Sequence, residues 1–411
     1  MGGITPAELA AVRGRLEAFA ADMFESLPRA DQRARGLCYL RGLMLDGRRK
    51  SVEPMAERLA DVQYQALHHF VAVSPWDWRP VRRRLAERLV GELEPTAWAV
   101  DDTGFPKDGD CSVGVQRQYS GTLGKVGNCQ LGVSVNAVTE QASCPLDWRL
   151  FLPESWDDEG MRQRRAACHL PDRVRHRPKW QLVLDMLDAL GAWGLRPPVL
   201  VADCGYGEVG EFRGGLDARQ LPYVVQIKAD TSAYAEQVRP ERLPYKGRGQ
   251  PSKPRYREPR SQVKQLVLAA GQAAGVDLIW RRGSKGLQRS QFVALRVRPA
   301  GVAPRRQATQ APDRELPVRW LLAEWPVTEP EPTAYWLSNL PADTPIVELV
   351  RLGKLRWRIE QDYRELKGAL GLDHFEGRGF GGWHHHVTLV AVAHGFLTLE
   401  RLRHPKPAAS A

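Results

Sequence analysis

Cysteine is scarce and scattered in this chain of 411 residues. None of its six cysteines lies in a CxxC pair, so neither a zinc site nor a disulfide framework is indicated. Reduced thiols are typical of the cytosol, and we therefore expect a cytoplasmic protein. The six residues are Cys38, Cys111, Cys129, Cys144, Cys168 and Cys204.

Long apolar runs are also missing. No run reaches the roughly 20 residues that a membrane-spanning helix needs. The first residues, MGGITPAELAAV, lack a charged segment followed by an apolar signal core, so we expect no membrane partner. Hydrophobic residues make up 43% and charged residues 26% of the chain, as in soluble globular proteins. At roughly 150 residues per domain, the length predicts two or three domains.

Negative charge is the scarcer sign. Asp and Glu number 48 against 59 Lys and Arg, which gives a net charge of +11 and a pI of about 9.5. This surplus favours a polyanionic partner, because each phosphate that a protein neutralises releases condensed counterions.

A nucleotide-binding loop is absent as well. The stretch SGTLGKVGN (120–128) contains glycines and a lysine. However, Gly121 and Gly124 lack the four-residue gap of GxxxxGK[ST], and Val126 occupies the Ser/Thr position. We therefore reject ATP binding and predict a glycine-rich connection between strands, with Lys125 close to a DNA phosphate.

Residues 1–93 are predicted to form a helical, DNA-binding N-terminal domain, because apolar residues recur at spacings of three and four. After a first helix, further helices are expected near Arg33–Leu45, Val52–Leu59, Val62–Val71 and Arg79–Leu89. Short helices with basic turns are compatible with helix-turn-helix DNA binding, and a bundle with a solvated basic edge explains them equally well. The basic residues are Arg48, Arg49, Lys50, Arg79, Arg82, Arg83 and Arg84.

In residues 94–229 the predicted secondary structure changes from helices to strands, and helices follow these strands. Three antiparallel strands and then an alternation of helix and strand indicate a mixed α/β sheet with helices on both faces. This layout is that of the RNase H-like nuclease fold. The predicted strands are AWAVDD (97–102), NCQLGVSVNAV (128–138), LDWRLFL (146–152), PPVLVAD (197–203) and PYVVQIK (222–228), and the predicted helices are Lys179–Trp193 and Gly207–Gln220.

Residues 230–343 are predicted to be a β-rich insertion into this core, with a separate small sheet. Its strands are expected at 276–286, 289–297, 317–325 and 333–340, after an exposed loop at 247–260 that is rich in Pro, Gly and Arg. Its tryptophans, Trp280, Trp320, Trp325 and Trp336, are mostly expected in the core of the sheet. The best candidates for DNA contact here are Arg281, Arg282 and Lys285.

Residues 344–405 are predicted to supply the C-terminal helices of the core. Val347–Leu372 is expected to be one long helix, with Thr344 as N-cap and Pro345 at its first position. One face of it carries a charged stripe, although such a stripe is often only a solvated helix face. The stripe consists of Arg356, Glu360, Tyr363, Arg364 and Lys367.

Three consecutive histidines, His384, His385 and His386, follow in the same region. Consecutive residues on a helix diverge by about 100°, so they do not readily converge on one metal ion. We expect surface or DNA-facing residues.

Two aspartates end predicted strands. Asp101 and Asp203 are each followed by a turn that contains glycine. Carboxylates at the C-terminal ends of central strands face the crevice in which open α/β sheets bind ligands, whereas the simpler alternative is an aspartate that caps a turn. Asp102 is the rival of Asp101, because adjacent residues of a strand point to opposite faces.

With Glu360, these aspartates make three carboxylates in the order strand, strand, helix. Attack on a phosphodiester needs a deprotonated nucleophile and relief of charge on the leaving oxygen, and two Mg²⁺ ions supply both. Oxygen ligands suit this hard cation. Asp101 would bridge both ions, and Asp203 and Glu360 would each hold one.

The string RWRIEQDYRELK resembles part of the signature of insertion-sequence transposases with an Asp-Asp-Glu site. Arg356, Glu360 and Lys367 match its Arg-x3-Glu-x6-Lys part, whereas Gly353 stands where that family has tyrosine. VDDTGFPKDG, SVGVQRQYSGTLGKVGNCQLGVSV and VLVADCGYG are similar to the insertion sequence 701 group, so that the resemblance covers residues 35–400. It favours Asp101, because VDDT then superimposes on the first-acid strand of related transposases.

The resemblance implies cut-and-paste DNA transposition with Mg²⁺, or Mn²⁺ in its place. Cleavage at the terminal inverted repeats, through a hairpin intermediate, would precede strand transfer to target DNA. Arg356 and Lys367 would contact transposon-end phosphates, with Tyr363 and Arg364 beside them. A homodimeric synaptic complex, association with the nucleoid and a tryptophan stacked on an unpaired base are also implied. A non-catalytic DNA-binding protein of transposase descent and a structure-specific nuclease of the same fold are the alternatives.

Overall fold

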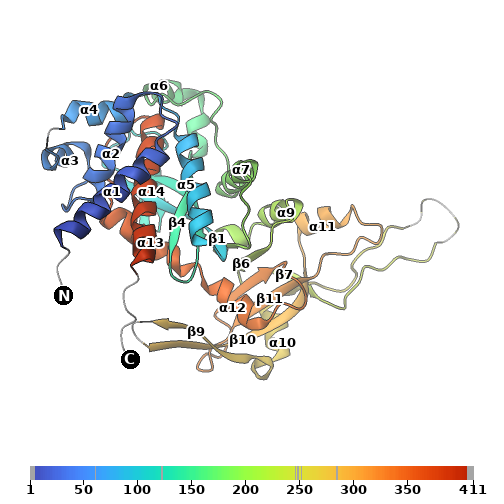
Figure 1. Ribbon diagram of the computed structural model, residues 1–411. Helices are drawn as coiled ribbons and strands as arrows, with labels where there is room; N and C mark the ends of the chain where they lie inside the picture. Colours follow the sequence, from blue (N-terminus) through green and yellow to red (C-terminus); the bar gives the residue numbers. More distant parts are fainter. Residues whose placement is uncertain are drawn as a thin grey trace. The chain divides into compact units, whose positions relative to one another are not determined.

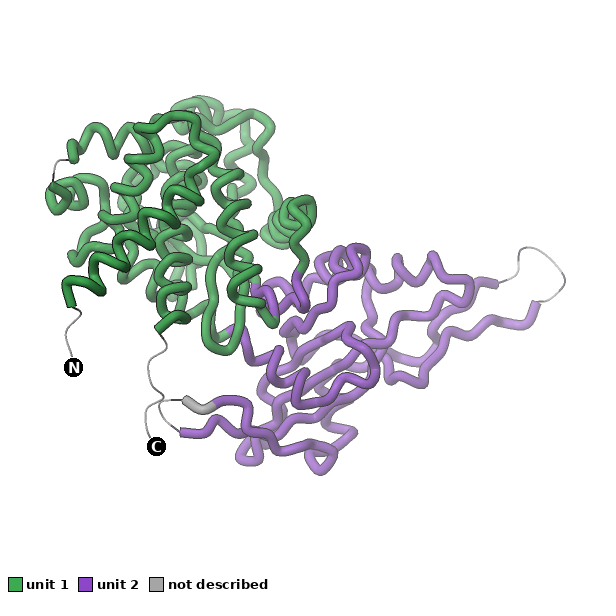
Figure 2. The backbone as a smooth tube through the Cα atoms, in the orientation of Figure 1, with its two compact units in different colours: residues 1–96, 100–196, 357–411 green, residues 97–99, 197–356 purple. Residues whose placement is uncertain are grey.

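The computed structural model describes residues 5–60, 62–121, 124–245, 247, 250, 252–283 and 286–404. The chain forms two compact units (Figure 2). The first unit comprises residues 1–96, 100–196 and 357–411, and the second comprises 97–99 and 197–356. The helices before residue 94 therefore share a unit with residues 100–196. The functional division into four segments stays a prediction.

The first unit contains most of the helices (Figure 1). Helix α1 begins with a capping box, in which the Thr5 side chain accepts from the Glu8 N–H and the Glu8 side chain accepts from the Thr5 N–H. The helices predicted between residues 5 and 93 are present. The helices are α1 (Pro6–Met23), α2 (Ala30–Met44), α3 (Val52–Arg58), α4 (Tyr64–His68) with a π-helical turn at His69–Val73, α5 (Trp78–Leu93), α6 (Arg162–Ala167) after two short 3₁₀ turns (Glu154–Asp157 and Glu159–Met161), α7 (Lys179–Ala192), α13 (Trp357–Gly368) and α14 (Phe380–Arg403).

Helix α14 is buried on almost every side, and this determines the core of the first unit. It packs against α5, α2 and β4. A helix that is surrounded in this way needs apolar or hydrogen-bonded residues all round, and both ring nitrogens of His385 and of His386 are hydrogen-bonded. None of the helices in the described part of the chain is long and apolar enough to cross a membrane.

The strands of the first unit are β1 (Ala97–Pro106), β2 (Gln116–Ser120), β3 (Lys125–Val138) and β4 (Ser143–Phe151). They are ordered β2-β3-β1, and β4 also pairs with β3. Strand β2 was not predicted from the sequence, and it pairs with β3 in antiparallel fashion. Ser120 lies opposite Lys125, so the glycine-rich stretch joins the end of β2 to the start of β3.

The second unit contains the remaining strands, in the order β5-β6-β12-β11-β10-β7-β8, with β9 on β10. The β5–β6 pair is parallel. The strands are β5 (Leu200–Ala202), β6 (Tyr223–Ile227), β7 (Ser232–Ala235), β8 (Ser261–Gln262), β9 (Val276–Gly283), β10 (Gly286–Pro299), β11 (Arg319–Glu324) and β12 (Ala334–Ser338), and the helices are α8 (Cys204–Gly207), α9 (Gly210–Ala218), α10 (Val263–Ala270), a 3₁₀ turn (Gln272–Ala274), α11 (Val302–Ala308) and α12 (Ile346–Lys354).

The prediction of a separate small sheet for residues 230–343 is wrong. Strand β12 pairs with β6 in antiparallel fashion, with Tyr335 opposite Ile227, so these strands extend the sheet that contains β6. The extension removes the unpaired edge that β6 would otherwise expose. Among the tryptophans, Trp325 and Trp336 are buried, whereas Trp280 and Trp320 are partly exposed.

The prediction of one long helix over 347–372 is also wrong. Helix α12 ends at Lys354 and α13 begins at Trp357, so Arg356 lies between two helices. The Leu355 N–H donates to Leu352 O, an i→i+3 bond that tightens the last turn. The N-cap is Pro345 rather than Thr344. The break coincides with the passage of the chain from the second unit to the first.

Candidate active site

Asp101 and Asp102 lie in the middle of β1 and are both partly buried. The Asp102 carboxylate accepts a hydrogen bond from Lys179 Nζ at 2.8 Å. Lys179 is the first residue of α7. The Asp101 Oδ1 atom accepts from the Asp102 N–H at 2.8 Å. The two acids thus differ in partner, and Asp102 is paired with a cation of α7.

The opposite face of β1 is the one that α14 and α13 cover. Phe105 packs on Trp383 of α14, with ring centroids 5.6 Å apart. A side chain at Gly132 of β3 would meet both rings, so this strand shows the same face to α14. Two residues on, the Ser134 hydroxyl is hydrogen-bonded to the Tyr363 hydroxyl of α13 at 2.7 Å. Because side chains alternate along a strand, Asp101 shares the face of Phe105 and therefore of α13.

Helix α13 carries Glu360 in its first turn, where the side chain is exposed. Ile359 and Leu366 of the same helix are buried in the core. The Lys367 Nζ donates to the Gly104 carbonyl of β1 at 2.7 Å, three residues beyond Asp101. The first unit therefore places Asp101 and Glu360 on elements that are bonded directly to one another.

The charged stripe predicted on this helix is not a single surface. Arg356 lies outside α13, and Tyr363 is buried with its hydroxyl on Ser134, so a DNA contact by Tyr363 does not fit its position. Lys367 is partly buried, and Arg364 is exposed. The prediction failed for Tyr363 because the helix buries the face that its ring occupies.

Lys367 also has an unusual ionisation. Burial lowers its pKa to about 8, because the charged form is poorly solvated there. A modest rise in pH above neutrality therefore removes the positive charge of Lys367.

We expect DNA affinity to fall between pH 7 and pH 9 if Lys367 neutralises a phosphate, since the amine loses its proton in this range. The free energy of unfolding should rise over the same range, because the unfolded chain still binds that proton when the folded chain does not. Fluorescence anisotropy at constant salt measures the affinity. Lys367→Arg, which stays charged, should bind with little pH dependence, and an equal fall in both proteins would contradict the assignment.

Asp203 belongs to the second unit, where it follows β5 and caps α8. Its Oδ1 atom accepts from the Tyr206 N–H at 3.3 Å. The glycines after it are needed for space, because a side chain at Gly207 would lie 2.1 Å from the Gln226 carbonyl oxygen of β6. The residues CGYG form α8, and Gly207 lets this short helix pack directly on β6, with Asp203 as its N-cap.

A further carboxylate of α13, Asp362, is buried on the side of β4. Burial raises its pKa to about 7, against a hydrogen bond with Ser143 that lowers it. It lies on the same helix as Glu360 but is enclosed in the core, which disfavours it as a metal ligand.

The other predicted DNA contacts are spread over both units. Lys125 is exposed at the start of β3. Arg281 is partly exposed on β9, which also includes the backbone of Arg282. Lys285 lies outside the described residues.

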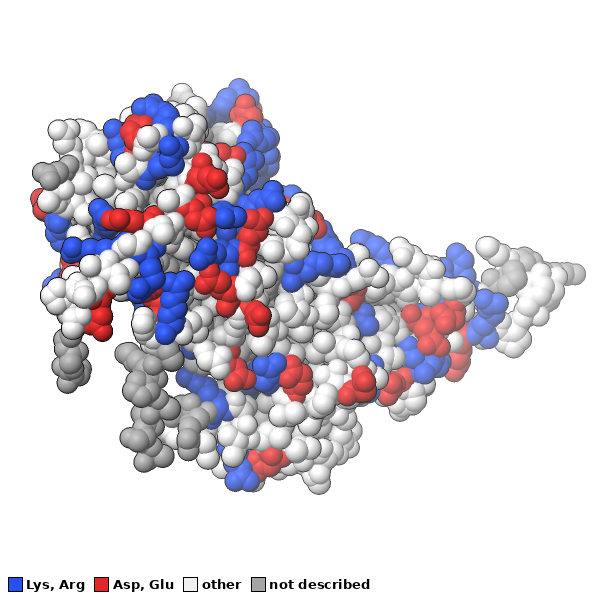
Figure 3. Space-filling view, in the orientation of Figure 1, with Lys and Arg blue, Asp and Glu red and all other residues white. Residues whose placement is uncertain are grey.

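The basic residues of the N-terminal helices are largely compensated. Lys50 and Arg82 are buried, Arg79 pairs with Asp77, and Arg83 pairs with Glu87. On the face of the first unit seen in Figure 3, lysine and arginine side chains alternate with acidic ones. The hypothesis of a basic edge on these helices is therefore weakened.

The prediction that the three histidines face solvent or DNA is wrong, because all three are buried in α14. His385 stacks on Trp76, with ring centroids 3.9 Å apart. His386 Nδ1 is hydrogen-bonded to the Tyr39 hydroxyl at 2.9 Å. Burial lowers the pKa of His384 well below its usual value. They are structural residues.

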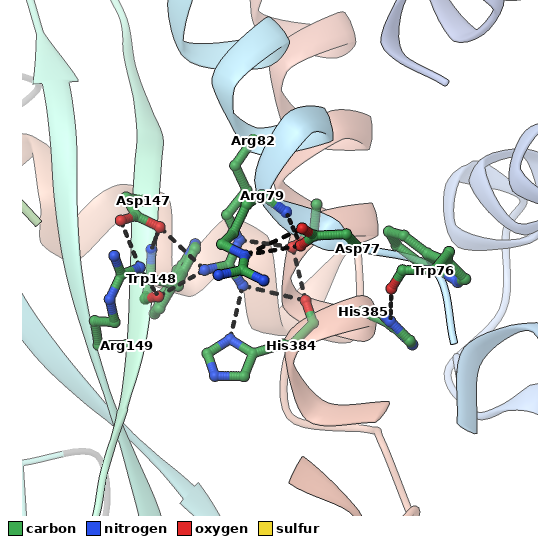
Figure 4. Close-up of polar contacts among 10 residues, drawn as sticks. Trp76, Asp77, Arg79, Arg82, Asp147, Trp148, Arg149, His384 and His385 are labelled. Atoms are coloured by element: carbon green, nitrogen blue, oxygen red, sulfur yellow. Dashed lines mark hydrogen bonds and ion pairs between the residues drawn. The ribbon is translucent and has the colours of Figure 1, made fainter. Parts of the chain in front are cut away.

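Arg82 is the hub of this buried polar network (Figure 4). Its Nη1 donates to Asp147 Oδ1 at 3.0 Å and to the Trp148 carbonyl at 2.6 Å. Its Nη2 meets His384 Nδ1 at 3.0 Å, and its Nε donates to the Thr388 hydroxyl at 2.7 Å. These hydrogen bonds connect α5, which carries Arg82, with β4 and α14. Its position on the helix face of Leu85 and Leu89 was a signal of burial in the sequence.

The candidate acids supply only oxygen ligands, which fits Mg²⁺ or Mn²⁺ and not zinc. Asp101 and Glu360 belong to the first unit and Asp203 to the second. Within the described residues, no three His, Cys, Asp or Glu side chains already form a group that would hold a metal ion.

A family model described as DDE superfamily endonuclease matches residues 22–287, which is more than half of the chain. The chain belongs to the DDE superfamily of endonucleases. The predicted resemblance is thereby confirmed at the level of the superfamily. Asp101 and Asp203 lie within the part of this DDE endonuclease that matches, and Glu360 lies beyond it.

The DDE endonuclease is also similar to a protein of Microchaete diplosiphon described as "Probable transposase for insertion sequence element IS701". The two are 30% identical over 192 residues, which is 46% of this chain and 47% of the relative. The chain thus spans about half the length of that relative.

Proposed function

We propose that this DDE endonuclease is a DNA transposase that cuts at the ends of its element and joins them to target DNA. The observation that carries the proposal is the link between β1 and α13, through Lys367 and Gly104 and through Tyr363 and Ser134. It supports Asp101 and Glu360 as partners on one face. The match to an endonuclease superfamily supports DNA as the substrate.

Asp101, Asp203 and Glu360 would hold Mg²⁺, with Mn²⁺ as a substitute. When bound, the ions would activate the attacking water or 3′-hydroxyl and offset charge on the leaving oxygen. Lys179 holds Asp102 on the other face, which supports Asp101 as the first acid. Glu360 stands exposed at the start of α13, where a ligand can reach it.

The basic residues of α13 would then serve the substrate. Lys367 donates to the Gly104 carbonyl of the acid strand, and this contact supports a role for its ammonium group near the scissile phosphate. Arg364 is exposed on the same helix. Phosphate contacts of this kind set the register of DNA without reading its sequence. A homodimeric synaptic complex remains part of the proposal.

The test is cleavage of labelled duplex ends from the element that encodes the chain, in Mg²⁺, Mn²⁺ or EDTA. We expect nicked or double-strand-cut products only with a metal, and joined products when target DNA is added. Asp203→Asn should remove both products while binding in EDTA persists. Cutting without joining would support a structure-specific nuclease instead.

The second candidate is a non-catalytic DNA-binding protein of transposase descent. Gly353 favours it, because related transposases have tyrosine there. In this structure a side chain at Gly353 would start 3.5 Å from the Trp336 ring, so the space beside α12 is already partly taken. Binding of element ends without cleavage in either metal would make this candidate the better one.

A further inference from the structure

The first unit has a pocket of about 310 Å³ that is unusually rich in arginine. Its volume corresponds to roughly ten water molecules at about 30 Å³ each, which is room for more than a single small ion. Leu150, Val174 and Phe380 are among its apolar lining residues. Five arginines line it: Arg79, Arg149, Arg173, Arg175 and Arg177. We call this pocket the arginine groove.

Ion pairs around the arginine groove leave positive charge uncompensated. Asp147 is shared by two guanidinium groups, at 3.0 Å from buried Arg82 and 2.6 Å from Arg149. Figure 4 shows the carboxylate between them. One positive charge therefore remains in this triad, and His384 adds none because burial keeps it neutral.

The same sharing occurs at Asp157, which contacts Arg165 at 3.1 Å and Arg175 at 3.8 Å. Arg173 is exposed, and no carboxylate lies within 4 Å of it in the described part of the chain. By contrast, Arg177 is paired with Asp185 at 2.5 Å. The groove thus combines compensated arginines with others that are free to attract an anion.

The arrangement of these arginines suits a polymer better than a single ion. Arg173, Arg175 and Arg177 are alternate residues of the segment between α6 and α7, and all three are exposed and line the groove. Two residues further, Lys179 contacts Asp102, the neighbour of the proposed first acid. The segment therefore ends at a contact with β1, on the face opposite Asp101.

We infer that the arginine groove binds successive backbone phosphates of the duplex DNA that flanks the cleavage position. The inference rests on the proposed function, since it names a DNA contact of the same enzyme outside its acids. Guanidinium groups suit this role because they stay charged and can contact phosphate oxygens with two N–H groups.

The test is the salt dependence of binding to a labelled duplex end, measured by anisotropy with full-length protein carrying Asp101→Asn in EDTA. The logarithm of the binding constant falls with the logarithm of the salt concentration, and each phosphate contact that is lost makes this slope less negative by about 0.9. We expect Arg173→Ala and Arg175→Ala to change it by about that amount each, by about 1.8 together, and to weaken binding roughly 5- to 10-fold each.

Arg13→Ala is the matched control, because Arg13 is an exposed arginine of the same unit on α1. It should leave slope and affinity unchanged. All variants should unfold at the wild-type temperature, since both groove residues are exposed. An unchanged slope in the groove variants, or an equal loss in Arg13→Ala, would overturn the inference.

Competition with inorganic phosphate separates a small-anion site from a DNA site. One result would also overturn the inference: inorganic phosphate binds the groove at millimolar concentration, but the salt dependence of DNA binding stays the same in every variant. The experiment needs no cleavage, so it is independent of the proposed function. If the wild-type protein cuts element ends and Arg173→Ala leaves the salt dependence of DNA binding unchanged, the proposed function stands and the groove contact does not.

Discussion

Asp101→Asn and Glu360→Gln are each expected to lower metal-dependent cleavage of duplex ends by roughly 10³-fold or more, equivalent to about 4 kcal/mol in the activation barrier. Each variant keeps the shape of the side chain and removes its negative charge. A divalent ion would lose a charged oxygen ligand on the face that α13 shares with β1. Quantified product bands over time give the rate.

Asp102→Asn is the matched comparison for Asp101→Asn. Its carboxylate lies on the face of α7 and is paired with Lys179. Loss of a partly exposed pair costs about 1 kcal/mol or less in stability, and cleavage should stay within about tenfold of wild type. A dead Asp102→Asn beside an active Asp101→Asn would reverse the assignment of the first acid.

Asp362→Asn serves as a control for Glu360→Gln, because both carboxylates lie on α13. Burial beside Ser143 keeps Asp362 out of the proposed site, so cleavage should persist. Binding in EDTA should be as tight as wild type for Asp101→Asn and Glu360→Gln, since both remove negative charge near phosphates. Weaker binding in step with lost cleavage would indicate disturbed folding instead.

The sequence predicted those parts of the fold that depend on local patterns. The strand around Asp101, the helix α7 and the N-terminal helices all follow local patterns of apolar residues. The extension of β6 by β12 could not be foreseen in this way, because strand pairing joins residues more than a hundred positions apart. The break before Trp357 was missed although Gly353, a poor helix former, lies in the last turn of α12.

The candidate site was predictable only in part. Alternation on β1 shows that Asp101 and Asp102 face opposite ways, but the sequence does not say which face α13 covers. That information came from the contact of Phe105 with Trp383 and from the bond between Lys367 and Gly104. The arginine groove was not predicted, because Arg79 and Arg149 are distant in sequence from the segment that supplies its other three arginines.

The second large effect is expected from Arg82→Met, a change outside the candidate active site. Arg82 is 2% exposed, and its guanidinium bonds to Asp147, Trp148, His384 and Thr388. Breaking a buried ion pair by removing one partner typically costs about 3–5 kcal/mol. We expect a loss of this size in the free energy of unfolding, together with faster amide hydrogen exchange in α5, β4 and α14.

Arg83→Met is the natural control, because Arg83 is the next residue and its pair with Glu87 is exposed. Such a pair contributes about 0.3–0.5 kcal/mol, so urea unfolding of this variant should resemble wild type. Adding Asp147→Asn to Arg82→Met should recover part of the loss, since it removes the buried charge that the first change leaves poorly compensated. Equal losses in Arg82→Met and Arg83→Met would show that the network does not hold the first unit together. A large loss with partial recovery would mean that the triad stabilises this unit and also positions Arg149 in the arginine groove, because Asp147 contacts both guanidinium groups.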